Sequence, residues 1–119
     1  MHRIVCALDP GHVVNPLTAE MQTESSVVYA LTAALYGEIT IDKGRVQQSN
    51  FHDYRMLRIN ETPKIEVHVV KSGEPPGGIG EAGTNAGPPA LRNAIYAATG
   101  VALRRMPIDR SLIAAGKRA

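Results

Sequence analysis

The stretch GGIGEAGTNAGPPAL, from Gly77 to Leu91, decides between two fold classes for this chain. Its residues Gly78, Gly80 and Gly83 match G-x-G-x-x-G, the pattern of a loop that holds a dinucleotide pyrophosphate. Such a loop needs a strand directly before the first glycine and a helix that begins within the motif. The free N–H groups at the start of that helix then meet the pyrophosphate.

Neither condition is expected to hold around this motif. The preceding strand should end near Val70, and a polar segment with two prolines separates it from Gly77. After Gly83, the sequence TNAGPP should delay the next helix until Pro88 or Pro89, which suit a first helical turn but offer no N–H. The match to a dinucleotide-binding fold is therefore expected to be accidental.

The segments before the motif show strand and helix patterns. Strands are predicted over RIVCALD, in a hairpin EITIDKGRVQQS that turns at Lys43-Gly44, and over PKIEVHVV, where Ile65, Val67 and Val69 should share one face.

A long helix is predicted before the hairpin. Val28, Leu31 and Leu35 form its apolar stripe, and Gly37 stands where its end is expected. Asn15 either caps this helix or forms a turn before it.

A second helix should follow the glycine-rich stretch. Leu91, Ile95 and Ala98 fall on one face, Gly100 should end the helix, and VALRRMPI predicts a short final strand. The resulting order β-α-β-β-α-(β) predicts an α+β fold: a two-layer domain with the helices packed on one face of a mixed sheet. We expect one domain over residues 1–119.

Composition excludes several classes of function. A net charge of +2 is too small to indicate nucleic-acid binding, and no apolar run is long enough to span a membrane. The start of the chain has no signal-peptide pattern, so a cytoplasmic location is expected, with a periplasmic one as the alternative. Cys6 is the single cysteine and the four histidines are scattered, so the chain's own side chains predict no metal site.

What remains in the opening stretch is the carboxylate of Glu81, between Gly80 and Gly83. Glycines let a ligand approach the backbone closely, and a carboxylate held there can serve as a general base. The alternative is that Glu81 is a loop carboxylate with local hydrogen bonds. Glu74 in the same loop has a weaker claim, because a proline follows it and it lies nearer the strand.

Several motifs, in the same order, resemble those of one family. GEPPGGIGEAGTNAGPPALRNAIYAATGVALRRMPI is similar to the C-terminal end of the molybdenum-binding large (beta) subunit of the xanthine dehydrogenase family. The isoquinoline 1-oxidoreductase and aldehyde oxidoreductase branch fits best. VCALDPGHVVNP, LTAALYGEIT and RVQQSNFHDYRMLRINETP extend the resemblance upstream, so that it covers about Arg3 to Ile108. It implies that the chain is the C-terminal fragment of a longer molybdopterin-binding subunit.

The resemblance also implies site residues and a reaction. In the family, a molybdenum–molybdopterin cofactor, usually the cytosine dinucleotide in bacteria, supports hydroxylation of a carbon in an N-heterocycle or an aldehyde. The general-base glutamate of the family motif G-x-G-E-x-G falls on Glu81. Cofactor-binding positions fall on Gly80 and Gly83, and the glutamine of the family motif Q-x-E-G-G falls on Gln22.

The chain departs from these motifs at two places. Ser25-Ser26 stand where the family usually has two glycines, and Ala82 stands where it often has proline. For His52 and Asp53, in SNFHDYR, we expect structural hydrogen bonding, and the sequence assigns no role to Tyr54.

The resemblance finally implies partners: the remainder of the molybdenum-binding subunit and an iron–sulfur small subunit. Because that remainder should supply most cofactor contacts, we expect the chain alone to bind no cofactor tightly, to be inactive and to form homo-oligomers. The competing hypothesis is a non-catalytic, self-associating α+β module, a gene remnant or an excised piece, that binds no cofactor.

Overall fold

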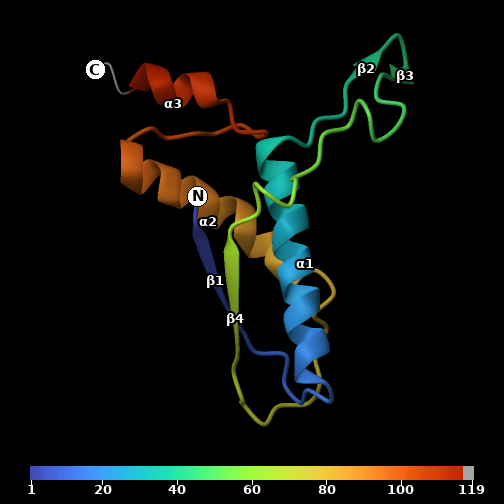
Figure 1. Ribbon diagram of the computed structural model, residues 1–119, viewed down its shortest axis with the longest axis vertical. Coiled ribbons are helices and arrows are strands. Elements are labelled where there is room, and N and C mark those ends of the chain that lie inside the picture. Colours follow the sequence, from blue (N-terminus) through green and yellow to red (C-terminus); the bar gives the residue numbers. More distant parts are fainter. Residues whose placement is uncertain (117–119) are drawn as a thin grey trace.

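The computed structural model describes residues 1–116, and Lys117–Ala119 lie outside the described part. Strands β1 (Arg3–Leu8) and β4 (Lys64–Val69) form a parallel pair. The chain between them contains helix α1 (Pro16–Leu35) and a short hairpin of β2 (Ile41–Asp42) and β3 (Arg45–Val46). Figure 1 shows β1 and β4 side by side, α1 along them, and the hairpin at the tip of a projecting arm formed by residues 37–61.

The α+β class is confirmed. The structure combines helices with a parallel strand pair and an antiparallel one, and the two pairs form separate two-stranded sheets. The hairpin turns at Lys43 and Gly44 as predicted, both with positive φ (46° and 77°). This conformation matches the twist of two-residue hairpins, and glycine adopts it at no steric cost.

Burial alternates along β1, as a period-two segment requires, and along β4 it alternates except at Glu66, which is half-buried like Ile65 and Val67. The predicted face of Ile65, Val67 and Val69 is confirmed, since these residues are half-buried. Facing the other way, Arg3 Nη2 lies 2.8 Å from Glu66 Oε2, and Lys64 Nζ lies 3.1 Å from Glu66 Oε1. Hydrogen bonds from Arg3, and then from Lys64, lower the pKa of Glu66 to about 2.

Of the two alternatives stated for Asn15, a helix cap or a turn, the structure shows the cap at the start of helix α1. The Asn15 side chain caps it by accepting the Thr18 N–H at 3.3 Å, and Pro16 occupies the first turn. Of the predicted stripe, Leu31 is fully buried, and the centre of the buried face lies along Val27, Leu31 and Ala34.

Helix α2 (Ala82–Thr99) begins earlier than predicted. The expectation that Pro88 or Pro89 opens this helix is wrong, because both lie inside it. An interior proline costs about 3 kcal/mol, so contacts of the first turns with α1 must offset this cost. Added Cβ atoms at Gly83 and Gly87 would contact α1 at 2.8 Å, which shows how closely the two helices approach. The end at Gly100, with φ 73°, is as predicted.

The earlier start of α2 removes one of the two reasons given against a dinucleotide loop. The other reason stands, because β4 ends at Val69 and an irregular segment follows it up to Gly80. The helix therefore does not follow a strand in the way that a pyrophosphate-binding turn requires.

The final strand predicted over VALRRMPI is wrong. Residues 101–109 are irregular and lead to helix α3 (Arg110–Gly116). They nevertheless contribute Leu103 and Ile108 to the core, and the Ile108 N–H donates to the Ala34 carbonyl at 2.8 Å. That carbonyl is in the last turn of α1, where it has no hydrogen-bond partner within its helix. The C-terminal segment therefore supplies a donor to the end of a helix and does not pair with the edge of a sheet.

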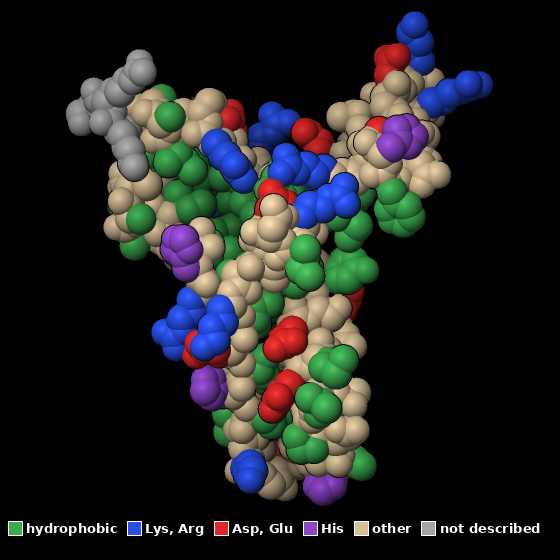
Figure 2. Space-filling view, viewed as in Figure 1, with side chains coloured by type: hydrophobic (Ala, Val, Ile, Leu, Met, Phe, Trp, Pro, Cys, Tyr) green, Lys and Arg blue, Asp and Glu red, His purple; other side chains and the backbone are tan. Residues whose placement is uncertain are grey.

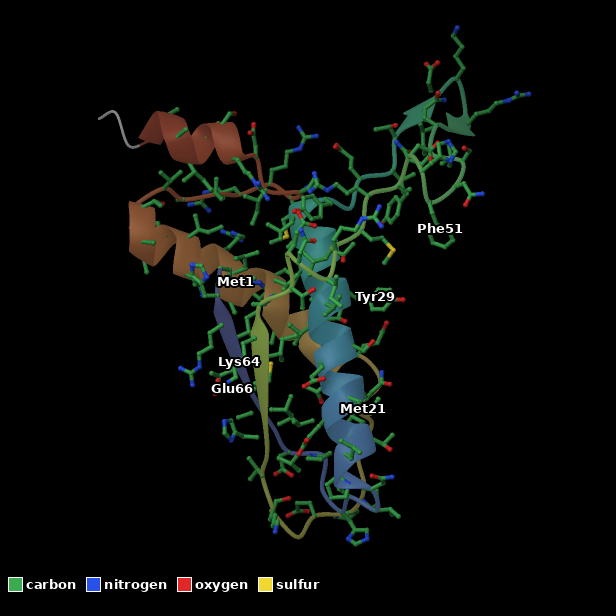
Figure 3. All side chains as sticks on the ribbon, viewed as in Figure 1. Met1, Met21, Tyr29, Phe51, Lys64 and Glu66 are labelled. Atoms are coloured by element: carbon green, nitrogen blue, oxygen red, sulfur yellow. The ribbon has the colours of Figure 1, made fainter. Side chains whose placement is uncertain are left out.

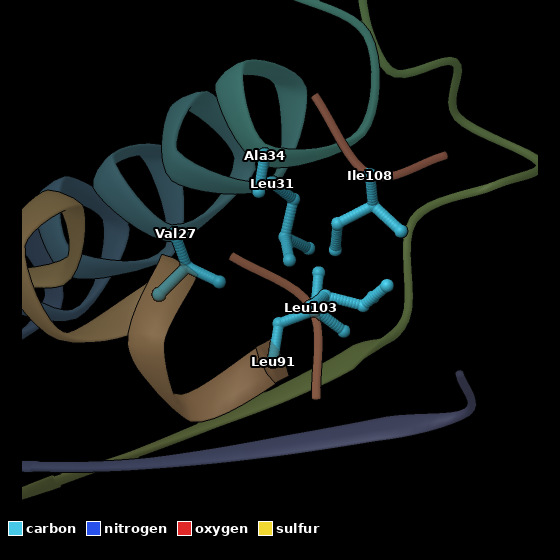
Figure 4. Packing of buried hydrophobic residues seen from close by; sticks show 6 residues of the cluster. All are labelled: Val27, Leu31, Ala34, Leu91, Leu103 and Ile108. Atoms are coloured by element: carbon cyan, nitrogen blue, oxygen red, sulfur yellow. The ribbon is translucent and has the colours of Figure 1, made fainter. Parts of the chain in front are cut away.

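The hydrophobic core lies where α1, α2 and this C-terminal segment meet. Figure 4 shows its buried side chains pointing into one common centre, with β1 and β4 passing beneath. The cluster consists of Val27, Leu31, Ala34, Leu91, Leu103 and Ile108.

Candidate functional site

A groove of about 450 Å³ lies between α1, the start of α2 and the base of the arm. Of the four predicted site residues, three line this groove: Gln22, Gly80 and Glu81. Gln22 is distant in sequence from the other two. The α1 residues supply one wall, and the turn that precedes α2 supplies another. The fold thus brings the glutamine motif and the glutamate motif to one place.

A direct hydrogen bond joins the two motifs. Gln22 Nε2 donates to the Gly80 carbonyl oxygen at 2.6 Å. Both residues are exposed, and an added Cβ at Gly80 would meet nothing within 4 Å. The backbone at Gly80 is therefore open to the close approach of a ligand.

Glu81 occupies the N-cap position of α2. Its carbonyl oxygen accepts the Thr84 N–H at 2.9 Å, but its side chain makes no capping hydrogen bond. The residue is exposed and lines the groove, and its side chain is not tied to its own helix. This geometry favours the general-base interpretation over that of a carboxylate with local hydrogen bonds.

Gly83 differs from Gly80 because it is buried against α1. Its N–H donates to Ser26 Oγ at 2.8 Å, and an added Cβ would lie 2.8 Å from the Val27 backbone nitrogen and would also collide with Ser26 Oγ. A side chain here would push the two helices apart. In this structure, Gly83 therefore serves the packing of α2 on α1.

Ser25 and Ser26, which stand where the resemblance implies two glycines, both line the groove but differ in burial. Ser25 is exposed on the groove wall, whereas Ser26 is buried and bonds to α2. The departure from the glycine motif thus creates a helix-to-helix hydrogen bond.

Aromatic and thioether side chains to which the sequence analysis assigned no role also line the groove: Tyr29, Tyr54 and Met56. Tyr29 and Met21 project from the side of α1 that faces away from β1 and β4 (Figure 3). Tyr29 stands seven residues after Gln22 on α1, so the two side chains lie on the same face of the helix. This periodicity could have predicted that Tyr29 lies at the same groove as Gln22. Tyr54 and Met56 come from the arm, and no local pattern marks them.

A turn in the arm is held by polar contacts. The Asp53 carboxylate accepts the N–H groups of Asn50 and Ser49 at 2.9 and 2.8 Å, which lowers its pKa to about 2. The structural hydrogen bonding expected for Asp53 is confirmed, and His52 Nε2 lies 3.6 Å from the same carboxylate. This turn directly precedes Tyr54 and so places it at the groove.

A second groove, of about 420 Å³, lies between β1 and α2. Its lining is formed mainly by apolar side chains and by small residues of α2, and it includes no aspartate, glutamate or histidine. The titratable side chains in its lining are Arg3 and Cys6, and burial raises the pKa of the Cys6 thiol. Among residues 1–116, no group of three or more histidine, cysteine or acidic residues could hold a metal ion. No helix within the same range has the length and apolar character needed to cross a membrane.

Comparison with known proteins identifies the kind of domain. The family model described as "Molybdopterin cofactor-binding domain" matches residues 1–63. Isoquinoline 1-oxidoreductase subunit beta of Brevundimonas diminuta is 38% identical over 92% of the chain, and the xanthine dehydrogenase molybdenum-binding subunit of Escherichia coli O157:H7 is 34% identical over 91%. A crystal structure of a Cu,Mo-CO dehydrogenase superposes on 98% of the chain with a TM-score of 0.81 and 27% identity.

The chain spans a small part of each of these proteins. It covers 14% of the isoquinoline 1-oxidoreductase subunit, 15% of the xanthine dehydrogenase subunit and 16% of the CO dehydrogenase chain. These relatives confirm the resemblance that the motifs indicated. The chain belongs to the molybdopterin cofactor-binding domain family.

Proposed function

We propose that the chain is the C-terminal domain of a molybdenum hydroxylase large subunit. In this role it contributes the general base Glu81 and part of the molybdopterin cradle for hydroxylation of an N-heterocycle or an aldehyde carbon. Its partners would be the remainder of that subunit and an iron–sulfur small subunit. The cytoplasmic location expected from the sequence stays a prediction.

One observation carries this proposal. The hydrogen bond from Gln22 to the Gly80 carbonyl joins the two family motifs next to a carboxylate without a capping bond, and all three residues line one groove. A general base needs a carboxylate that can reach a ligand, and Glu81 meets this condition.

The residues of the groove fit a molybdopterin cofactor, in the cytosine dinucleotide form that the resemblance implies. Such a cofactor presents many hydrogen-bonding groups, and the groove offers the Gln22 amide, the Ser25 hydroxyl and the open backbone at Gly80. Gln22 and Gly80 would hold the cofactor directly. Gly83 would contribute through the packing of α2, because its own backbone is buried against α1.

When bound, the cofactor would supply the redox chemistry of the hydroxylation. The part of this chain in the reaction is to hold a proton acceptor, the Glu81 carboxylate, at the groove wall. The wall formed by this chain is incomplete, since Gln22, Gly80 and Glu81 are all exposed. The remainder of the subunit would have to exclude water there, so the isolated chain should bind the cofactor poorly and show no turnover.

The test is Glu81→Gln in the complete molybdenum-binding subunit that carries this chain. The amide keeps the size of the side chain and removes the proton acceptor, so turnover per bound molybdenum should fall by roughly 100- to 10,000-fold. Glu74→Gln is the matched control, because Glu74 is exposed in the same loop and does not line the groove. Full turnover of Glu81→Gln with molybdenum still bound would refute the assignment of the base.

The second candidate is the non-catalytic, self-associating module. The observation behind it is the set of apolar side chains exposed along the arm and α1, because such surface promotes association. Reading the genomic sequence upstream of Met1 would separate the two: an in-frame large subunit supports the hydroxylase. Oxidation of an aldehyde by the chain alone, after addition of purified cofactor, would contradict the expected inactivity of the isolated chain.

A further inference from the structure

We propose that Gln22 and Ser26 are positioning residues that hold Glu81 from both sides, and that Ser26 caps α2 in place of Glu81. This inference rests on the proposed role of Glu81 as the base. It assigns a function to the buried serine, which stands where a glycine is usual in the family.

The first step is the spacing of the two residues on α1. Gln22 and Ser26 are four residues apart, so their side chains lie on the same face of the helix, one turn from each other. Gln22 Nε2 binds the Gly80 carbonyl at 2.6 Å, and Ser26 Oγ binds the Gly83 N–H at 2.8 Å. Between these two attachment points lie only Glu81 and Ala82, so α1 fixes the backbone directly before and after the glutamate.

The second step concerns the free N–H groups at the start of α2. The first N–H groups of a helix have no partner in the helix, and the side chain at the N-cap position usually binds one of them. Here the N-cap residue is Glu81, and its side chain makes no such bond. Ser26 of the neighbouring helix supplies the acceptor to Gly83 instead.

The third step is the orientation of the serine. Ser26 Oγ donates its own proton to the Thr23 carbonyl at 2.8 Å, so its lone pair is directed to the Gly83 N–H. Ser26 is 4% exposed, which leaves little access for a water molecule that could replace the hydroxyl. Thr84 Oγ1 adds a third link to the Ser26 carbonyl at 3.4 Å.

The consequence is that the Glu81 carboxylate is not used by its own helix. If Ser26 is changed to alanine, the Gly83 N–H loses its acceptor in a buried position. The Glu81 carboxylate, which belongs to the N-cap residue, would then be a competing acceptor for that N–H. Its return to the helix would withdraw it from the groove, so the serine hydroxyl controls where the base points.

The experiment compares Ser26→Ala with Thr99→Val in the complete subunit that carries this chain. Thr99 is the matched control: its hydroxyl binds the Ile95 carbonyl at 2.7 Å and the Val101 N–H at 3.1 Å, at the opposite end of the same helix. The measurements are molybdenum content, kcat and KM, and hydrogen exchange of the peptide segment 80–90.

For Ser26→Ala we expect about tenfold faster amide exchange at the start of α2, as for the loss of one hydrogen bond. Because misplacement of a reacting group is costly, kcat should fall roughly tenfold to a hundredfold, with KM within about twofold and molybdenum content unchanged. Thr99→Val should keep the wild-type kcat and leave exchange over 80–90 unaltered. A Gln22→Ala variant should speed the exchange of the same segment.

Three outcomes would overturn the proposal or separate it from the proposed function. If Ser26→Ala keeps the wild-type kcat while Glu81→Gln is inactive, Ser26 does not position the base, and the base assignment stands. If Ser26→Ala loses molybdenum and keeps its turnover per metal, the serine serves cofactor retention and the proposal is wrong. If Glu81→Gln is fully active, the proposed function fails. If, in addition, Ser26→Ala leaves the hydrogen exchange of segment 80–90 unchanged, the positioning role of Ser26 is refuted as well.

Discussion

The crossing of α1 and α2 and the arm of residues 37–61 are stabilised in opposite ways. In the crossing, Val27 and Leu31 are at most 1% exposed, and glycines bring the helices into contact. In the arm, Phe51 is 79% exposed and Ile59 95%, and order comes from polar turns such as that of Asp53. Figure 2 shows the arm standing away from the body. The body is thus held by its own contacts, whereas the arm exposes apolar side chains of the kind that promote association.

The largest expected effect on stability tests the body. Leu31→Ala removes a fully buried side chain from the centre of the core. The free energy of unfolding should fall by about 2–5 kcal/mol, from lost burial and the cavity left behind. Chemical denaturation followed by circular dichroism measures this loss. A change below about 1 kcal/mol would mean that the core is not organised around α1.

The next effect compares two glycines of one motif. Gly83→Ala should destabilise the chain by about 1–3 kcal/mol, because the new methyl group collides with α1. Gly80→Ala is the control, since its added Cβ meets nothing within 4 Å and should change stability little. Equal destabilisation by the two variants, in the same denaturation assay, would contradict the close approach of the helices at Gly83.

A smaller effect is expected in acid. The pKa of Glu66 in the body and of Asp53 in the arm both lie at about 2, below the usual values of these carboxylates. Because the folded state lowers these pKa values, their stabilising contribution is complete above about pH 5 and is lost as the pH falls toward 2. Carboxyl resonances followed by NMR should titrate near pH 2. Glu66→Gln should flatten the acid dependence of the melting temperature, and an unchanged profile would contradict the contribution of Glu66.

The smallest effect on stability is expected in the arm. Phe51→Ser and Ile59→Ser remove exposed side chains, so each should change the free energy of unfolding by no more than about 0.5 kcal/mol. The same variants should reduce self-association of the isolated chain, because they remove apolar surface. Light scattering over a range of concentrations measures this. If the wild-type chain is monomeric at all concentrations, the exposed apolar side chains of the arm do not cause association.

The sequence predicted helix ends and turns that depend on the conformational preferences of a few neighbouring residues. The Lys43-Gly44 turn and the Gly100 end follow from one or two residues with restricted conformations, whereas for Asn15 the sequence left a helix cap and a turn as alternatives. The start of α2 did not follow, because Pro88 and Pro89 favour a first turn, and only contacts with α1 explain a helix that begins at Ala82.

The candidate site divides in the same way. The motifs marked Gln22 and Glu81, and the structure brings their segments together in one groove. Tyr54 was not assigned, because its place at the groove depends on how the arm folds back. The hydrogen bond from Gly83 to Ser26 was also beyond sequence reasoning, since it joins two helices that are distant in the chain.

The parallel pairing of β1 with β4 has a consequence for the order of folding. Arg3 pairs with Lys64, so β1 cannot find its partner until α1 and the whole arm have been synthesised and the loop between them has closed. Pairings between such distant segments form slowly, and the apolar side of β1 stays uncovered while the chain grows. Helix α1, with local contacts and its own cap, can form first and offer Val27 and Leu31 as the surface on which the two strands meet.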